Sequence, residues 1–299
     1  MNYKLNIQLI QQVRLSDLDY SLLPEIHSKN QWKKLIKSNI IYVNGILGQT
    51  STWIYDNDCI EIKWLEKMAK VSPKVFPLNL DIVYEDDFLA IIIKPAGIPV
   101  SGNVFKSVQN ALPHNLTKSE AMLENDDFQT CHRLDFHTSG LLLISKTRKC
   151  RVLIGKMFES NTIQKKYFAI VQGVPSPDQG IWEQPINDKI SKSTYKVLRT
   201  VPSIKNENIS LVELIPETGR THQLRIHSAL NKYPIVGDTK YGEQGNILKG
   251  KGLFLNAYSL EFEHPISNEI INIKQPVPTK FESLLVREKK MFNKQFEKG

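Results

Sequence analysis

Two charged side chains of opposite sign, Arg133 and Asp135, stand two residues apart in the segment CHRLDFHTSGLLL, which runs from residue 131 to residue 143. In an extended segment, side chains two residues apart point to the same side of the backbone. A fixed carboxylate can act as a nucleophile or as a base, so Asp135 is the first candidate for a catalytic group. An aspartate close to Thr138 and Ser139 can instead stabilise a turn, and that alternative stays open at this point.

An apolar run from Leu141 to Ile144 follows this polar cluster and predicts the element that holds it in place. Four consecutive aliphatic residues after a Gly-containing segment are typical of a short buried strand. The charged pair therefore lies in a loop just before a rigid core element, which can keep catalytic side chains in one geometry.

The composition bounds the kinds of protein that this chain can be. Its 299 residues are 41% hydrophobic, which is enough for one large domain or two moderate domains. The net charge of +8 favours a polyanionic partner, although many soluble proteins are mildly basic. The three cysteines lack the spacing of a zinc site, and their odd number argues against a disulfide framework. Because no stretch approaches the roughly 20 apolar residues that cross a bilayer, we expect a soluble, cytoplasmic protein without a membrane partner.

Many strand patterns and few helical patterns indicate the fold class of the larger part of the chain. Two strands are expected around an Asp86-Asp87 turn, and later strands at LLLISKT, KYFAIVQG, STYKVLRT, ISLVELI, LFLNAYSLEF and IINIKQ. Helical patterns cover residues 148–158 and 221–230. Strands joined by short turns predict an α+β fold with a mixed, largely antiparallel sheet.

A small basic module is expected near the N-terminus. In NQWKKLIKSNI, the residues Trp32, Leu35 and Ile36 form one apolar stripe of a short helix. The lysines that face away from this stripe are Lys33, Lys34 and Lys37. A strand, an Asn44-Gly45 turn and further strand patterns follow. The stretch KLIKSNIIYVNG resembles the S-four-like RNA-binding domain, and the resemblance implies that these lysines contact phosphate. A solvated lysine face on an ordinary helix is the alternative.

Prolines and lysines without periodicity in KMAKVSPKVFPLN predict an extended connection between two domains. We therefore expect a small α/β RNA-binding domain over residues 1–72, a linker over residues 73–80 and a catalytic domain over residues 81–285. The basic residues 286–299 are expected to form a solvated tail or a final short helix.

Four motifs occur in order in the larger domain: KPAGIPV, HRLDFHTSG, KKYFAIVQG and ETGRTHQLRIHSALNKYPIVGDTKYG. Together they resemble the signatures of the RluA-type pseudouridine synthases, RNA isomerases that convert uridine to its carbon-linked isomer. The resemblance spans roughly residues 80–280 and implies a pseudouridine synthase catalytic domain that needs no cofactor. At two positions the chain departs from the family, which often has Gly at Lys232 and His at Asn256; we expect these departures to affect local loop shape.

The resemblance also implies roles for individual residues. Asp135 matches the catalytic aspartate, which stabilises or attacks the sugar carbon C1′ or acts as a base toward the sugar. Arg225 matches the arginine that pairs with this aspartate, and a cation beside a carboxylate favours its ionised form. An exposed helix arginine is the alternative for Arg225.

Two further residues are expected to act on the target base, which must leave its stack in folded RNA before it can react. Arg133 matches the arginine that fills the space which the target base leaves, and a phosphate contact is the alternative. Tyr167 matches the tyrosine that stacks against uracil, whereas strand tyrosines in general are core residues. Its neighbours Lys165 and Lys166 are expected to serve the backbone or solvent.

The remaining candidates lie around the start of the second helical pattern. Arg220 and the nearby backbone amides are expected to hold phosphate or the loop itself, with Thr221 as a candidate helix cap. The chain has no histidine pair with metal-ligand spacing and a completing carboxylate, so we expect no metal.

We therefore predict a pseudouridine synthase that acts on RNA as a monomer. Ribosomal RNA of the large subunit is the expected substrate, and transfer RNA is the main alternative. A factor that binds RNA or assembling ribosomes with dispensable catalysis is an alternative from another class. A hydrolase that releases the base is a third, and free uracil as product would identify it.

Overall fold

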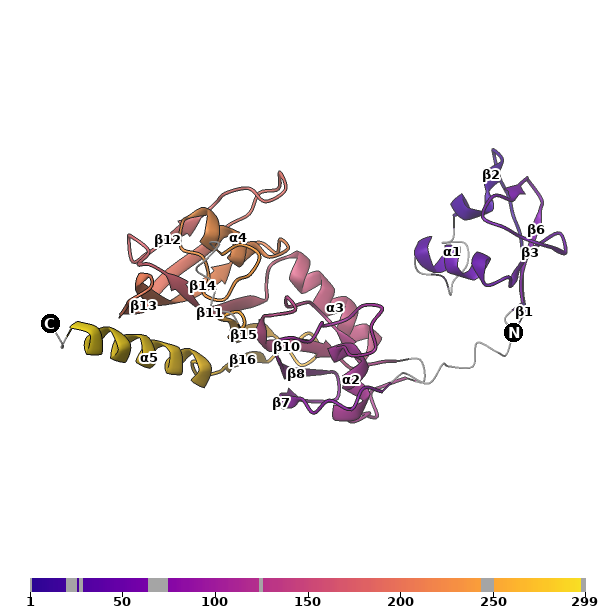
Figure 1. Ribbon diagram of the computed structural model, residues 1–299. Coiled ribbons are helices and arrows are strands. Elements are labelled where there is room, and N and C mark those ends of the chain that lie inside the picture. Colours follow the sequence, from indigo (N-terminus) through magenta and orange to yellow (C-terminus); the bar gives the residue numbers. More distant parts are fainter. Residues whose placement is uncertain are drawn as a thin grey trace. The chain divides into compact units, whose positions relative to one another are not determined.

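The computed structural model describes residues 2–19, 26, 29–63, 75–123, 126–242 and 250–296. The chain divides into two compact units, Met1–Pro73 and Lys74–Gly299 (Figure 1). The expected boundary near residue 72 and the first part of the expected linker fall among residues 64–74, which lie outside the described residues.

In its described residues, the N-terminal unit contains the short α-helix α1 (Lys29–Lys37) and a small sheet. The strand order of the sheet is β1 (Asn2–Asn6), β6 (Cys59–Lys63), β3 (Ile41–Val43) and β4 (Ile46–Leu47). Two shorter strands, β2 (Val13–Arg14) and β5 (Trp53–Ile54), pair beside a turn of 3-10 helix at Leu15–Asp17. Trp32 is fully buried, and its indole nitrogen donates a 2.6 Å hydrogen bond to the carbonyl of Leu15. The helix and the hairpin that the sequence predicts are both present.

The larger unit is built on one twisted sheet, which has ten strands in the described part of the chain. The path across it begins with β12 (Gln179–Trp182), β13 (Ser193–Ser203), β14 (Glu207–Pro216) and β11 (Gln164–Gln172). It continues with β15 (Leu255–Glu263), β10 (Ser139–Ser145), β8 (Leu89–Lys94) and β7 (Asp81–Glu85). β16 (Ile270–Lys274) pairs with β15, and β9 (Gln129–Thr130) pairs with β10.

One parallel pair interrupts this otherwise antiparallel sheet, because β10 runs parallel to β15. The predicted α+β class with a mixed, largely antiparallel sheet is thus confirmed. In β10, the residues from Gly140 to Ser145 are all buried, as expected for a central strand that is covered on both faces. Short strands at Gln129–Thr130 and Gln179–Trp182 were not predicted, because neither has an alternating apolar pattern.

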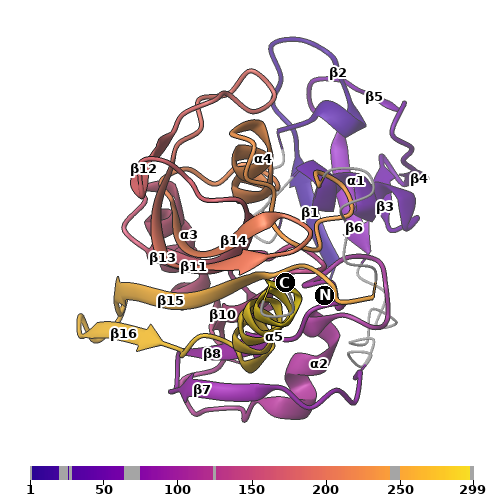
Figure 2. The same cartoon turned by 60° about the vertical axis from the view of Figure 1, so that its left-hand side comes forward.

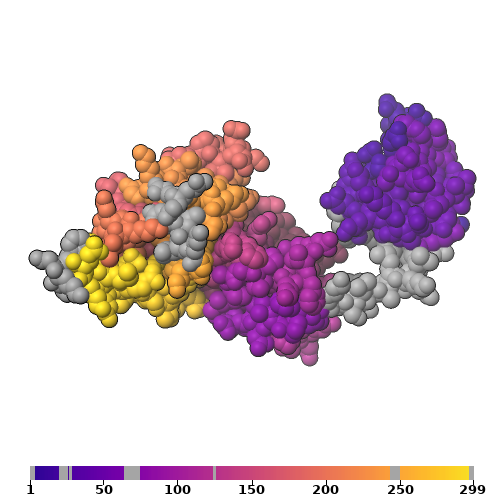
Figure 3. All heavy atoms as spheres, viewed as in Figure 1, coloured from indigo at the N-terminus to yellow at the C-terminus, as the bar shows by residue number. Residues whose placement is uncertain are grey.

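The described helices of the larger unit are α2 (Val108–Asn115), α3 (Arg148–Glu159), α4 (Gln223–Leu230) and α5 (Thr279–Phe296). The first of these, which contains Pro113, was not predicted. α4 and α5 lie on opposite faces of β11, β13 and β14 (Figure 2). α5 packs through Phe281, Leu284 and Leu285 and then runs along the surface (Figure 3). Residues 286–296, expected to form a solvated tail or a final short helix, are the continuation of this helix, which begins at Thr279.

The described residues of the expected linker, 75–80, are held against the larger unit. The backbone nitrogen of Phe76 donates to the carbonyl of Asn110, and that of Leu80 donates to the side chain of Asn115. In the described part of the chain, no helix is both long and apolar enough to cross a bilayer.

Candidate active site

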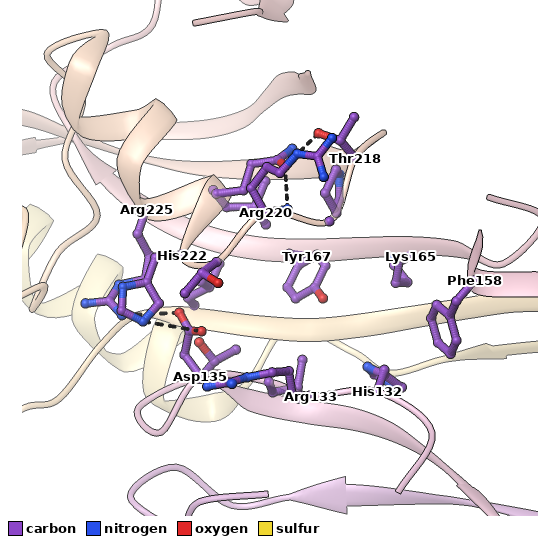
Figure 4. A pocket seen from close by; sticks show the side chains of 18 of the residues that line it. His132, Arg133, Asp135, Phe158, Lys165, Tyr167, Thr218, Arg220, His222 and Arg225 are labelled. Atoms are coloured by element: carbon purple, nitrogen blue, oxygen red, sulfur yellow. Dashed lines mark hydrogen bonds and ion pairs between the residues drawn. The ribbon is translucent and has the colours of Figure 1, made fainter. Parts of the chain in front are cut away.

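An open pocket of about 440 Å³ lies where the loop before β10, strand β11 and the start of α4 meet. Figure 4 shows Asp135, His222 and Arg225 at one end of this pocket, Phe158 and Lys165 at the other, and Tyr167 between them. The predicted residues Asp135, Arg133, Tyr167, Arg220 and Arg225 all line it. The structure therefore brings together side chains that are up to 92 positions apart in the sequence, from Arg133 to Arg225.

Arg225 binds Asp135 across the pocket floor. Its Nη1 atom donates a 3.2 Å hydrogen bond to Oδ2 of Asp135. The Arg225 side chain is 6% exposed and that of Asp135 is 16% exposed, so this is a shielded contact and not a surface ion pair. A charge-assisted hydrogen bond in such a place favours the carboxylate anion and fixes its direction.

The rest of the Arg225 guanidinium group is held by Asp238. Nε donates to Oδ2 of Asp238 at 2.7 Å and Nη2 donates to Oδ1 at 2.8 Å, which is a bidentate pair. Asp238 also accepts the backbone N–H groups of Lys240 and Tyr241. Burial would raise the pKa of Asp238, but these hydrogen bonds and the charge of Arg225 hold it below its ordinary value. Burial likewise opposes the charge of Arg225, and the two aspartates together still raise its pKa.

His222 approaches the other oxygen of the same carboxylate. Its Nε2 atom lies 3.7 Å from Oδ1 of Asp135, and its Nδ1 atom lies 2.9 Å from the Tyr241 hydroxyl. His222 has φ of 58° at the residue before α4, a left-handed conformation that turns its ring toward the pocket. Burial lowers the pKa of His222, although the charge of Asp135 opposes the shift, so the ring is mainly neutral at pH 7.

Lys94 supports the Asp135 loop from beneath. It is fully buried, and its Nζ atom donates to the carbonyls of Pro95, Phe136 and Thr138 at 2.9, 3.3 and 2.8 Å. Two of these carbonyls belong to the residues that follow Asp135. Burial lowers the pKa of Lys94 to about 8, while the charge of Asp135 acts in the opposite direction.

Tyr167 stands on β11 beside an irregularity in the sheet. Lys166 pairs with Ser259 but Tyr167 pairs with Ala257, so β15 has one extra residue at this point. Such a bulge changes the direction of nearby side chains and is frequent next to active sites. Tyr167 is half-buried, and its ring forms the middle of the pocket wall (Figure 4). Burial and then the charge of Asp135 raise the pKa of its hydroxyl, which therefore stays protonated.

Arg133 is exposed at the pocket mouth, on the same side of the chain as Asp135. Arg220 lies at the rim, where its Nε atom donates a 3.1 Å hydrogen bond to the carbonyl of Ile190. This contact favours the expectation that Arg220 holds the loop itself. Thr221, the expected helix cap, does not cap α4: His222 occupies that position, without a capping hydrogen bond from its side chain.

The three basic residues expected to contact RNA in the N-terminal unit lie on α1 and are at least partly exposed; they are Lys33, Lys34 and Lys37. His227 is buried and hydrogen-bonded to Ser191, Ser193 and the carbonyl of Gln184, so its ring is not free to bind a metal. In the described ranges, no group of three His, Cys, Asp or Glu side chains is arranged to hold a metal ion.

The two departures from the family have structural counterparts. Lys232 adopts φ of 68°, a conformation that glycine reaches without strain. Asn256 donates a 2.9 Å hydrogen bond to the Ser139 hydroxyl and so joins β15 to the first residue of β10.

Four residues of the pocket environment were not predicted from the sequence: Lys94, Lys165, His222 and Asp238. Each lies inside one of the four motifs, but its role depends on a partner that is not its neighbour in the sequence. An acidic residue in the same motif as Arg225 is the signal that could have identified Asp238.

The comparisons with known proteins find RNA pseudouridine synthases. A family model described as RNA pseudouridylate synthase matches residues 89–230. An uncharacterized RNA pseudouridine synthase of Synechocystis sp. is 31% identical, with 92% of this chain and 88% of that protein covered. The ribosomal large subunit pseudouridine synthase C of Rickettsia bellii is 34% identical, with 67% and 69% covered. The synthase D of Pasteurella multocida is 30% identical, with 93% and 94% covered.

Solved structures share the fold. The human RNA Pseudouridylate Synthase Domain Containing 4 has a TM-score of 0.56 and 24% identity, with 70% of this chain and 93% of that chain covered. The human Domain Containing 1 protein has a TM-score of 0.55 and 24% identity, with 66% and 83% covered.

Proposed function

Because this chain belongs to the family of RNA pseudouridine synthases, which are isomerases, we propose that it converts uridine to pseudouridine in large-subunit ribosomal RNA, with Asp135 as the catalytic group. The ion pair between Asp135 and the doubly anchored Arg225, in the wall of an open pocket, is the observation that carries the assignment of the site.

The reaction breaks the N1–C1′ bond, turns the uracil and joins its C5 atom to C1′. The proton that C5 loses is balanced by the proton that N1 gains, so no oxidant or energy source is needed. Asp135 either attacks C1′ and is displaced later, or removes a proton from the sugar. Both routes need an ionised carboxylate in one position. Arg225 keeps the carboxylate of Asp135 ionised and in place, because Asp238 fixes the plane of the Arg225 guanidinium group.

The flat ring of Tyr167 supports a role in holding the uracil while it turns. Stacking on an aromatic face contributes about 1 to 3 kcal/mol per base and leaves the base free to rotate in its own plane. Arg133, exposed at the mouth, is placed to enter the space from which the base is extruded.

The choice of ribosomal RNA rests on two relatives that are named for the large ribosomal subunit. The net charge of +8 and the exposed lysines of α1 fit an RNA partner. We assign residues 1–72 to an S-four-like RNA-binding domain, whose Lys33, Lys34 and Lys37 contact phosphate.

The test is a map of pseudouridines in ribosomal and transfer RNA from cells that lack the protein, and from cells in which the wild type or Asp135→Asn is restored. We expect a site in large-subunit RNA to disappear and to return only with the wild type, because an amide cannot act as an anionic nucleophile or base. Asp178→Asn, at an exposed aspartate away from the pocket, is the matched control.

A lost site in transfer RNA would move the substrate assignment to that RNA. If Asp135→Asn restored the lost site as fully as the wild type does, the catalytic assignment would be wrong. A growth or ribosome defect that Asp135→Asn repairs, with an unchanged pseudouridine map, would indicate an RNA-binding role instead.

A further inference from the structure

The pocket has a second end that the proposed chemistry does not use. At this end lie Lys165, which precedes Tyr167 by two residues on β11, and Phe158, from the last turn of α3. Figure 4 shows both side chains on the far side of Tyr167 from Asp135. Because side chains two residues apart share one face of a strand, Lys165 follows Tyr167 along the same wall, about 7 Å farther on.

Lys165 carries a shielded charge that forms no ion pair with the described residues. Its Nζ atom lies over the Phe158 ring, 5.2 Å from the ring centre. Among the residues that the structure describes, no carboxylate forms an ion pair with it, and burial is the cause that lowers its pKa. A cation is costly to shield from water unless a partner compensates it, so its position inside a pocket favours an anionic ligand.

The neighbouring His132 adds no second positive charge beside Lys165. The Nε2 atom of His132 accepts a hydrogen bond from the backbone N–H of Leu143, and its ring packs 5.1 Å from that of Phe158. Burial, followed by the charge of Lys165, lowers the pKa of His132 to about 3. The imidazole is therefore neutral at pH 7. The charged groups that line this end of the pocket are Lys165 and the exposed Glu159, and no ion pair joins the two.

We propose that Lys165 binds a phosphodiester group of the RNA strand at the target uridine, and that it thereby sets the position of the nucleotide along the pocket. This inference rests on the proposed function. A single ammonium group binds a phosphate as a point charge, without reading a base. If Tyr167 stacks against the uracil and Asp135 faces the sugar, the phosphate at Lys165 is one of the two linkages that flank the target.

Binding to an unmodified transcript of large-subunit ribosomal RNA tests the proposal without turnover. The measurement uses the full chain carrying Asp135→Asn, with and without Lys165→Met, over a series of salt concentrations. Lys166→Met is the matched control, because Lys166 neighbours Lys165 on β11 but does not line the pocket. Lys165→Arg tests whether charge alone restores binding.

We expect Lys165→Met to weaken binding about tenfold and to reduce the slope of log affinity against log salt by about 0.7, which corresponds to one lost phosphate contact. Lys166→Met should change neither quantity as much, and Lys165→Arg should recover most of the affinity. A Lys165→Met protein that behaves like Lys166→Met in both affinity and slope would overturn the proposal.

Short RNAs that contain the target uridine show which of the two flanking phosphodiester linkages Lys165 contacts. A neutral methylphosphonate on the 5′ or the 3′ side of that uridine removes one phosphate charge at a time. A methylphosphonate at the linkage that Lys165 contacts should weaken binding by the wild type. The same substitution should not further weaken binding by Lys165→Met, which has already lost the contact. If each methylphosphonate weakened binding by Lys165→Met by the same factor as binding by the wild type, Lys165 would not contact either linkage directly.

Release of tritium from C5 of uridine in the same transcript keeps this proposal separate from the proposed function. A wild-type protein that releases no tritium from ribosomal or transfer RNA would defeat the proposed reaction, whatever Lys165 does. A wild type that is active while Lys165→Met has the kcat, KM and RNA affinity of Lys166→Met would defeat only the present proposal.

Discussion

Arg225 binds two aspartates that lie on opposite sides of it in the sequence: Nη1 reaches Asp135, 90 residues earlier, while Nε and Nη2 clamp Asp238, 13 residues later. The two contacts differ in kind, because Asp238 is almost fully buried and bidentate, whereas Asp135 faces the pocket through one hydrogen bond. Asp238 therefore acts as the anchor of the guanidinium group, and Asp135 is the carboxylate that this group positions.

Asp238→Asn should slow turnover while Asp135, the carboxylate to which we assign catalysis, is kept. An amide offers one acceptor where the guanidinium group now finds two, so Arg225 loses part of its anchor and Asp135 shifts. A misplacement of this kind can cost about 100-fold in kcat, with a smaller change in KM. Breaking the buried pair should also lower the free energy of unfolding by about 3 kcal/mol. Steady-state kinetics and denaturant titration, with Asp178→Asn as control, measure both effects; a wild-type kcat would show that Asp238 does not position the site.

Tyr167→Phe should retain RNA affinity, because the ring that faces the pocket is kept. Tyr167→Leu should weaken binding by about 1 to 3 kcal/mol, the usual contribution of one stacked base. The raised pKa of the Tyr167 hydroxyl leaves it protonated at pH 7, so it is not a base there, and Tyr167→Phe should keep most of the turnover. Binding and single-turnover rates separate the two contributions. A Phe variant as inactive as the Leu variant would assign an essential role to the hydroxyl.

Gly140→Ala should destabilise the protein strongly. Gly140 has φ of 115°, and a Cβ atom there would lie 2.2 Å from the carbonyl oxygen of Ala257 on the neighbouring strand β15. Because the atoms that this Cβ would meet belong to the backbone of Ala257, the two strands must separate, at a cost of about 2 to 3 kcal/mol. Gly155→Ala in α3 is the matched control: a Cβ atom there meets nothing within 4 Å, and the change should stabilise the helix by about 0.5 to 1 kcal/mol. Equal melting temperatures for the two variants would contradict this account.

Lys94 should make stability depend on pH in the alkaline range. Its folded pKa of about 8 lies below the ordinary value of 10.5, so the unfolded chain binds a proton between these values that the folded chain has lost. The sign of the linkage is therefore positive: stability through Lys94 rises as the pH increases from about 8 to 10.5. Lys94→Met cannot titrate and leaves three carbonyls without their donor, so at pH 7 it should be less stable than the wild type by about 1 to 3 kcal/mol.

The measurement for Lys94 is the difference in unfolding free energy between the wild type and Lys94→Met at several pH values. This difference should widen above pH 8, because only the wild type gains stability from the lost proton. Lys166→Met, which also removes one lysine from the larger unit, corrects for changes in overall charge. A difference that stays constant from pH 7 to pH 10 would mean that the pKa of Lys94 is not lowered.

Much of this architecture could be predicted from local sequence. The apolar run from Leu141 to Ile144 predicts a buried strand because four aliphatic side chains have no other low-energy place than the core, and β10 confirms it. The stripe of Trp32, Leu35 and Ile36 predicts α1 in the same way. Helix α2 was not predicted because it contains a proline, Pro113, directly after its buried apolar residues, and an internal proline normally argues against a helix.

The sequence by itself determined the residue types of the site and the reaction class, because four motifs carry the carboxylate, the aromatic ring and the arginines in a recognisable order. Only the tertiary structure decided that Asp238 anchors Arg225, that Lys94 supports the Asp135 loop and that Lys165 shares the pocket with Tyr167. Hydrogen bonds and ion pairs act over about 3 to 4 Å, and chain spacing does not reveal which distant segments a sheet brings that close. Here the antiparallel pairing of β8 with β10 places Lys94 opposite Gly140, close to the carbonyls of the Asp135 loop that it binds.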